Sequence, residues 1–149
     1  MLSLSRENWA RICEHAGRDY PSECCGILLR AADGACEVRP CENIQDRLHR
    51  EHPEDYPRDS RTAYQMGDPL ILDRASRAGQ LMGIYHSHID CDAYFSDKDR
   101  ADALPWGEPA YPGAIYLVLS VHGREVRGRM AFAWEEGRRV FEEAPVVIG

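Results

Sequence analysis

The chain contains 149 residues, of which 44% are hydrophobic and 29% are charged. These proportions are typical of a folded globular domain and exclude a mainly disordered chain. The formal net charge of −7 argues against a general nucleic-acid-binding protein, because such proteins present a basic surface to phosphate groups. We expect one domain over residues 1–149, a length sufficient to bury a core.

The N-terminal sequence and the cysteines indicate a cytoplasmic protein. Residues 1–16 lack the basic stretch and continuous apolar run of a secretory signal. No apolar run approaches the roughly 18 residues needed to span a bilayer. The six cysteines show neither a CxxC pair nor the spacing of a disulfide-rich scaffold, so we expect reduced thiols.

The first part of the chain predicts a helix followed by a hairpin. Ser5 is a suitable N-cap for a helix over 5–18, where apolar residues recur at spacings of three and four. Residues 24–30 and 35–43 predict two strands joined by the turn sequence "ADG". Residues 45–60 are highly charged and weakly periodic, and they predict a surface loop or a mobile insertion.

The remaining chain predicts strands alternating with helices. Asp68 and Pro69 are typical of a helix start, and Gly79 is typical of a helix end. The expected elements are a strand at 61–66, a helix at 67–79, a strand at 80–88, a helix at 96–104, strands at 114–121 and 125–135, and a last strand near 139–142. This order favours an α/β fold in which helices pack on a mixed sheet.

Two histidines end the strand predicted at 80–88. On a strand, the side chains of His86 and His88 point to the same face, so their imidazoles converge. Two surface histidines at a strand end would give the same pattern, so the pair alone does not establish a metal site.

A carboxylate from the next helix can complete the set. "SDKD" has the form of a capping box, which places Asp99 in the first turn after Ser96. Two imidazoles and one carboxylate form a zinc site with an open fourth position, as in catalytic zinc centres. Hydrolysis also needs a base, and Glu23 precedes an apolar strand that could bring it close. Read separately, the serine and aspartate could simply cap a helix, and Glu23 could be an ordinary exposed residue.

Together these residues resemble the JAMM motif of the JAB1/MPN/Mov34 metallopeptidases. The motif combines a Glu before a strand with H-x-H-x7-S-x-x-D, which here is Glu23, His86, His88, Ser96 and Asp99. The order of elements up to about residue 120 also matches, and the chain is similar to short prokaryotic members. The resemblance implies a mixed, curved sheet flanked by helices, with an architecture like that of cytidine deaminases.

The resemblance also implies a role for each motif residue. His86, His88 and Asp99 would bind one Zn²⁺, with water as the fourth ligand. Glu23 would act as general base and then as proton donor to the leaving amine. Ser96 would donate a hydrogen bond to the oxyanion of the tetrahedral intermediate.

The chain departs from the family pattern at two places. Many members carry Pro after the second histidine, where this chain has Ile89, and residues 45–60 have no place in the pattern. His86, His88 and Asp90 also spell H-x-H-x-D, as in metallo-β-lactamase-like hydrolases. Those usually continue with His, where this chain has Cys, and their fold needs a longer chain with more distant ligands.

Other polar and aromatic residues are assigned mainly to packing or to the surface. Cys91 could be a fourth ligand or a redox-active thiol but is more simply a loop residue, and Asp90 and Asp92 are expected to be solvated or to contact the substrate. Of Cys24 and Cys25, we expect one to point into the core and the other outward. The remaining assignments are surface positions for His15, His49, His52 and His122 and packing roles for Trp9 and Trp134. Trp106 either packs or, because its Pro/Gly loop follows the predicted site helix, lines a substrate groove.

The resemblance implies a zinc-dependent metallopeptidase that cleaves a peptide or isopeptide bond. The expected substrate is the C-terminal tail of a ubiquitin-like or sulfur-carrier protein. One alternative is an isopeptidase that releases a ubiquitin-like protein from lysine. Another is a non-catalytic MPN module that acts as a scaffold, although such modules typically lose metal ligands and this chain keeps all three.

Overall fold

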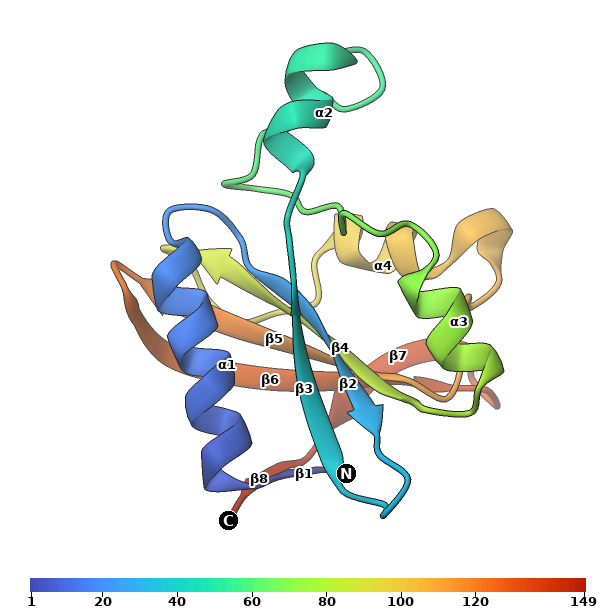
Figure 1. The fold of residues 1–149 in the computed structure, drawn as a ribbon. Coiled ribbons are helices and arrows are strands. Elements are labelled where there is room, and N and C mark those ends of the chain that lie inside the picture. The colour runs from blue at the N-terminus through green and yellow to red at the C-terminus, as the bar shows by residue number, and fades with distance from the viewer.

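A computed structural model describes all residues from Met1 to Gly149. Its centre is a six-stranded sheet in the order β3-β2-β4-β5-β6-β7 (Figure 1). Neighbouring strands are antiparallel except for β4 and β5, which are parallel. The strands are β2 (Cys25–Arg30), β3 (Cys36–Cys41), β4 (Leu81–Ile89), β5 (Ile115–His122), β6 (Glu125–Glu135) and β7 (Val140–Ala144).

Helices cover both faces of this sheet. α1 (Arg6–Asp19) packs on one face, whereas α3 (Ile71–Arg77) and α4 (Asp97–Ala103) lie on the other (Figure 1). A further helix, α2 (Gln45–Glu51), projects beyond the strand ends, and a 3-10 turn (Pro105–Gly107) follows α4. The expected mixed sheet flanked by helices is therefore the observed fold.

The two apolar layers explain the burial of adjacent cysteines. Cys24 belongs to the core beneath α1, where it joins Ile12 and Tyr85, and Cys25 belongs to the opposite core with Phe95. Both cysteines are fully buried, so the expectation that one points outward was wrong. Their side chains do alternate, but each face of the sheet is covered by helices.

Two short strands at the chain ends were not expected. β1 (Leu2–Leu4) pairs in parallel with β8 (Val146–Ile148) and brings the two termini together (Figure 1). Leu2 and Leu4 are buried in the core beneath α1. Each segment is only three residues long, so its own sequence carries little periodic signal.

Three expected elements differ in the structure. Residues 61–66 form no strand. Their end makes only an isolated bridge, between Met66 and Asn43, with the segment that follows β3. The helix expected from 67 begins at Ile71, and the Asp68 carboxylate accepts a hydrogen bond from the backbone of Leu70 (3.0 Å). Residues 45–60 contain α2 instead of being a loop throughout.

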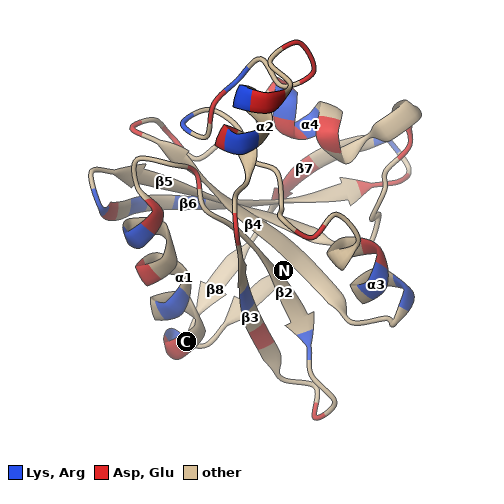
Figure 2. Cartoon of the chain, turned by 45° about the horizontal axis from the view of Figure 1, so that its top comes forward, with Lys and Arg blue, Asp and Glu red and all other residues tan.

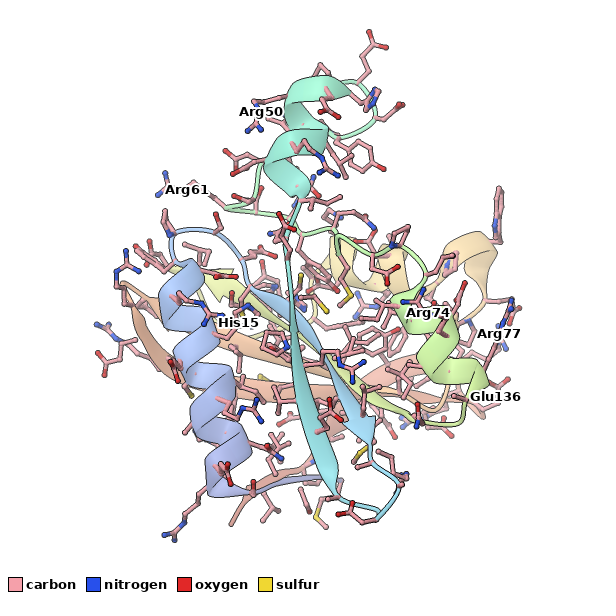
Figure 3. The ribbon with its side chains drawn as sticks, in the orientation of Figure 1. His15, Arg50, Arg61, Arg74, Arg77 and Glu136 are labelled. Carbon is pink, nitrogen blue, oxygen red and sulfur yellow. The ribbon has the colours of Figure 1, made fainter.

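His15 is not a surface residue as expected. It lies on α1 and points toward the sheet (Figure 3), where it is only 3% exposed. Its Nδ1 lies 2.8 Å from the Tyr85 hydroxyl, and its Nε2 lies 3.0 Å from an Asp19 carboxylate oxygen. These two partners satisfy both ring nitrogens, which allows an imidazole to be buried.

Charged side chains lie on the helices, on the connecting loops and on the other strands of the sheet, while the central strands β4 and β5 carry none (Figure 2). This distribution follows from burial of both central strands on both faces. None of the helices combines the length and the apolarity needed to cross a bilayer. Trp9 and Trp134 pack as expected, against the Arg129 guanidinium and the Phe141 ring respectively.

Gly26→Ala is expected to destabilise the protein by about 1–3 kcal/mol, a typical cost of overpacking a core. A Cβ at Gly26 would overlap the ring of Tyr85, whose hydroxyl is held by His15. Gly128→Ala is the matched control, because its Cβ would meet nothing closer than 3.6 Å. Urea unfolding of the two variants provides the measurement, and equal stability would show that the Tyr85 ring is not fixed.

Candidate metal centre

Two histidines lie side by side at the end of β4. His86 and His88 share one face of the strand, which pairs with β2 on one side and β5 on the other. The two residues are only 1% and 5% exposed, and their Nε2 atoms lie 3.2 Å apart. A central, buried strand therefore fixes the relative position of the two imidazoles.

Asp99 completes a triangle with the two histidines. Its Oδ1 lies 3.1 Å from Nε2 of His86, and its Oδ2 lies 3.1 Å from Nε2 of His88. The expected capping box is present: the Ser96 hydroxyl oxygen accepts from the Asp99 N–H, and the Ser96 N–H donates to Asp99 Oδ2, both at 3.0 Å. The helix start thus orients the carboxylate toward the strand end.

The triangle has the dimensions of a tetrahedral zinc site. Zinc binds imidazole nitrogen and carboxylate oxygen at about 2.0–2.2 Å, which places neighbouring tetrahedral ligands about 3.3 Å apart. The observed separations among His86, His88 and Asp99 are 3.1–3.2 Å. These three are the only His, Cys, Asp or Glu residues whose ligand atoms gather in this way. The donor set therefore fits a zinc ion bound through both Nε2 atoms and the carboxylate.

Hydrogen bonding of His88 supports the same assignment. Its Nδ1 lies 3.2 Å from the carbonyl oxygen of Asp92, which can only accept, so Nδ1 carries the proton. In the neutral ring Nε2 then presents a lone pair to the cluster, as a metal ligand must. Nδ1 of His86 is buried without a partner, and the Tyr64 ring stacks on this imidazole with centroids 4.8 Å apart.

Burial and charge separate the two carboxylates of the site. Burial favours the neutral acid at Asp99, but its contacts with the His86 and His88 imidazoles, together with the N–H of Ser96, hold its pKa well below the usual range. Burial, followed by repulsion from Asp99, raises the pKa of Glu23 to about 9. Without a cation nearby, Glu23 is therefore protonated at neutral pH.

The backbone around Glu23 is held from three directions. Its N–H donates to the carbonyl of Ser60 (2.7 Å), and its carbonyl accepts from the side-chain amide of Asn43 (2.8 Å). The next residue, Cys24, donates its N–H to the hydroxyl of Ser87 (2.8 Å), which lies between the two histidines. Glu23 is thus tied to β4 and to two segments outside the motif.

The start of the segment 45–60 holds its last residue, Ser60, in place. Asp46 accepts from both the N–H and the hydroxyl of Ser60, at 2.8 and 2.9 Å. Because the Ser60 hydroxyl donates to Asp46, the Ser22 hydroxyl must donate to Ser60, at 2.7 Å. The side chain of Gln45 also donates to the carbonyl of Arg58 (2.9 Å). Residues 45–60 are therefore folded against the segment that carries Glu23, just before β2.

Two cavities meet at the cluster, and Tyr64, Asp99 and Asp102 line both of them. The first, here called the aromatic cavity, is lined by residues including Met66, His86, Phe95, Tyr111 and Tyr116. The second, here called the Glu23 cavity, is lined by residues including Glu23, Arg58, Arg61, His88, Tyr94 and Ser96. Every residue that the motif singled out borders one of these spaces.

Asp90 and Cys91 stay outside the triangle. Asp90 accepts hydrogen bonds from the Tyr20 hydroxyl (2.9 Å) and from the Gly123 N–H (3.2 Å). Cys91 is exposed at the rim of the Glu23 cavity. Asp90 therefore orders the loop. The metallo-β-lactamase-like interpretation requires Asp90 as a metal ligand, and Asp90 is not part of the cluster.

Trp106 does not line a groove as expected. It lies at the tip of the 3-10 turn, its side chain is fully exposed, and it borders neither cavity. Three residues that do surround the site were not expected there: Asn43, Ser60 and Tyr64. Only Asn43 carried a signal, since Asn after a strand often bonds to nearby backbone groups.

The comparisons with known proteins agree with this fold. A family model described as "Prokaryotic homologs of the JAB domain" matches residues 5–135. The chain belongs to this family. A protein named desampylase, from Haloferax volcanii, is 31% identical over 134 residues, and the match covers 83% of each protein.

Solved structures share the fold at lower identity. A protein from Desulfitobacterium hafniense is similar with a TM-score of 0.66 and 20% identity, over 100% of this chain and 93% of that one. A JAB1/MPN domain protein from Archaeoglobus fulgidus is similar with a TM-score of 0.53 and 15% identity, over 99% of this chain and 98% of that one. The predicted JAMM/MPN fold is thereby confirmed.

Glu23→Gln is expected to stabilise the metal-free protein at neutral pH. A folded-state pKa of about 9, against 4.5 for an unperturbed glutamate, means that the folded state binds an extra proton between these values. The native glutamate therefore costs stability that grows as pH rises from about 4.5 to 9, up to about 3 kcal/mol at pH 7. Denaturant unfolding in chelator at pH 4.5, 7 and 9 tests this, and a pH-independent difference would contradict it.

Proposed function

We propose that the protein is a zinc-dependent peptidase that cleaves a peptide or isopeptide bond at the C-terminal tail of a ubiquitin-like or sulfur-carrier protein. The single observation that supports the metal is the triangle of His86, His88 and Asp99, whose edges fit tetrahedral zinc. The open fourth position is typical of a catalytic centre and not of a structural one.

Zinc, when bound, supplies a Lewis acid that polarises a carbonyl and makes water a nucleophile near neutral pH. Glu23 borders the same cavity as His88 and Asp99, and its backbone is fixed by Ser60 and Asn43. A fixed carboxylate in this position can take a proton from water and pass it to the leaving amine. A nearby divalent cation favours the carboxylate form, which would bring the pKa of Glu23 down from about 9 toward neutrality.

Ser96 is suited to stabilise the oxyanion. Its oxygen already accepts from the N–H of Asp99, so its hydroxyl proton is free to donate into the cavity. The capping interaction also fixes the side chain in one rotamer, which makes Ser96 a preorganised donor. In this proposal the residue has both a structural and a chemical role.

The proposed substrate class rests on the family and on the relative from Haloferax volcanii. Similarity to a protein named desampylase supports isopeptidase-type activity on ubiquitin-like proteins. Removal of residues from a sulfur-carrier tail uses the same site and differs only in the leaving group. A non-catalytic scaffold is the less favoured interpretation, because all three proposed ligands, the base and the hydroxyl donor are present.

The purified protein is expected to bind one zinc ion per chain, and Asp99→Ala or His88→Ala is expected to lose it. Glu23→Gln is expected to keep the zinc and to lose at least a hundredfold in kcat for cleavage of a ubiquitin-like fusion. Metal analysis and mass spectrometry of the products provide the two measurements.

Cys91→Ser is the matched control, because Cys91 borders the Glu23 cavity without joining the triangle. It is expected to keep both zinc and activity. Full activity of Glu23→Gln, or a zinc content unchanged by Asp99→Ala, would rule out the proposed mechanism.

A further inference from the structure

Two arginines without an ion-pair partner line the Glu23 cavity. Arg58 and Arg61 both line it, both are exposed, and neither forms an ion pair with any carboxylate in the chain. Figure 3 shows Arg61 on the segment that returns from α2 toward the sheet. In a protein with a net charge of −7, two unpaired cations beside the proposed reaction centre form a candidate site for an anionic ligand.

Besides Glu23, the acidic residues that line the cavity are engaged by other groups. Asp102 is occupied by Lys98, at 2.6 Å, and Asp99 is engaged by the two histidines. Arg58 makes one contact of its own, a 3.4 Å hydrogen bond from its guanidinium to the carbonyl of Thr62. Both arginines therefore keep most of their donors free for an anion.

The segment that carries the two arginines is anchored. Arg58 and Arg61 flank Ser60, whose N–H and hydroxyl are held by Asp46 and whose carbonyl binds the Glu23 N–H. The carbonyl of Arg58 is also fixed, by the side chain of Gln45. The backbone of the pair is thus placed relative to the catalytic carboxylate, which lowers the entropic cost of binding a ligand there.

The position of Glu23 indicates which part of the substrate enters this cavity. In the proposed reaction Glu23 gives a proton to the leaving nitrogen, so the leaving group must lie beside it. Glu23 borders the cavity with the arginines and does not border the aromatic cavity. The leaving group therefore lies on the cationic side, and the acyl part extends the other way.

We propose that Arg58 and Arg61 form a carboxylate-binding subsite, so that the preferred leaving group is a C-terminal amino acid with a free α-carboxylate. This inference rests on the proposed function. Of the two kinds of bond that the proposed function allows, it selects the peptide bond to a C-terminal amino acid. In such a substrate the carboxylate carbon is two bonds from the leaving nitrogen, whereas a lysine Nε in a protein has no carboxylate at that distance. Hydrolysis breaks the C–N bond, adds the hydroxyl of water to the acyl carbon and its proton to the amine, and needs no other reactant.

The test compares two peptides that end in Gly-Gly-Ala and differ only in a C-terminal carboxylate or carboxamide. Binding of each fluorescent peptide is measured with zinc-loaded Glu23→Gln protein, which should not turn it over. The carboxylate peptide is expected to bind about tenfold or more tightly than the carboxamide, and Arg58→Gln/Arg61→Gln in that background is expected to remove this preference. The preference should also weaken as salt is raised.

Arg50→Gln is the matched control, because Arg50 lies on α2 in the same charged segment and borders neither cavity (Figure 3). It is expected to keep the full preference. Equal affinity for the two peptides, including no measurable binding of either, overturns the inference. So does a preference that survives removal of both arginines.

Hydrolysis by the otherwise native protein separates this inference from the proposed function. Cleavage of both peptides at equal rates would leave the peptidase proposal standing and reject the carboxylate subsite. Arginine-dependent binding of the carboxylate peptide without cleavage of any substrate, including an isopeptide-linked one, would support the subsite and reject the peptidase proposal.

Discussion

The Nε2 lone pair of His88 and the carboxylate of Asp99 present negative charge density to one point, and they lie 3.2 and 3.1 Å from Nε2 of His86. Such an arrangement favours positive charge between the three groups. His88 cannot supply it from Nε2 as a neutral ring, because its proton is committed to the Asp92 carbonyl. A buried imidazolium would satisfy the carboxylate but would carry a desolvation cost. A divalent cation resolves the conflict, and the surrounding structure is organised to hold these three groups in place.

The support comes from elements with different roles. β4 is buried on both faces and fixes the histidines, while the capping box at α4 fixes Asp99. Ser60, at the end of the charged segment 45–60, and Asn43, just before that segment, hold the backbone of Glu23. Burial beside Asp99 raises the pKa of Glu23, so the site stores an unfavourable arrangement that a bound cation would relieve. The buried Glu23 thus lowers the free energy of unfolding of the metal-free protein at the site where the chemistry is proposed to occur.

The ligand triangle could be predicted from sequence because its geometry is local. The alternation of a strand aligns His86 with His88, and a capping box fixes Asp99 in a helix start. Glu23 needed the family pattern, since it lies 63 residues before His86 and only sheet pairing brings it near. Three features that the sequence did not predict also depend on long-range contacts. They are the burial of His15, the pairing of the chain ends, and the folding of residues 45–60.

A crystal structure of the zinc-loaded protein shows directly whether the triangle is a zinc site. We expect one zinc ion about 2.0–2.2 Å from Nε2 of His86, Nε2 of His88 and a carboxylate oxygen of Asp99. Nδ1 of His88 should still donate to the Asp92 carbonyl. Zinc bound instead through Cys91, or a histidine bound through Nδ1, would contradict the account.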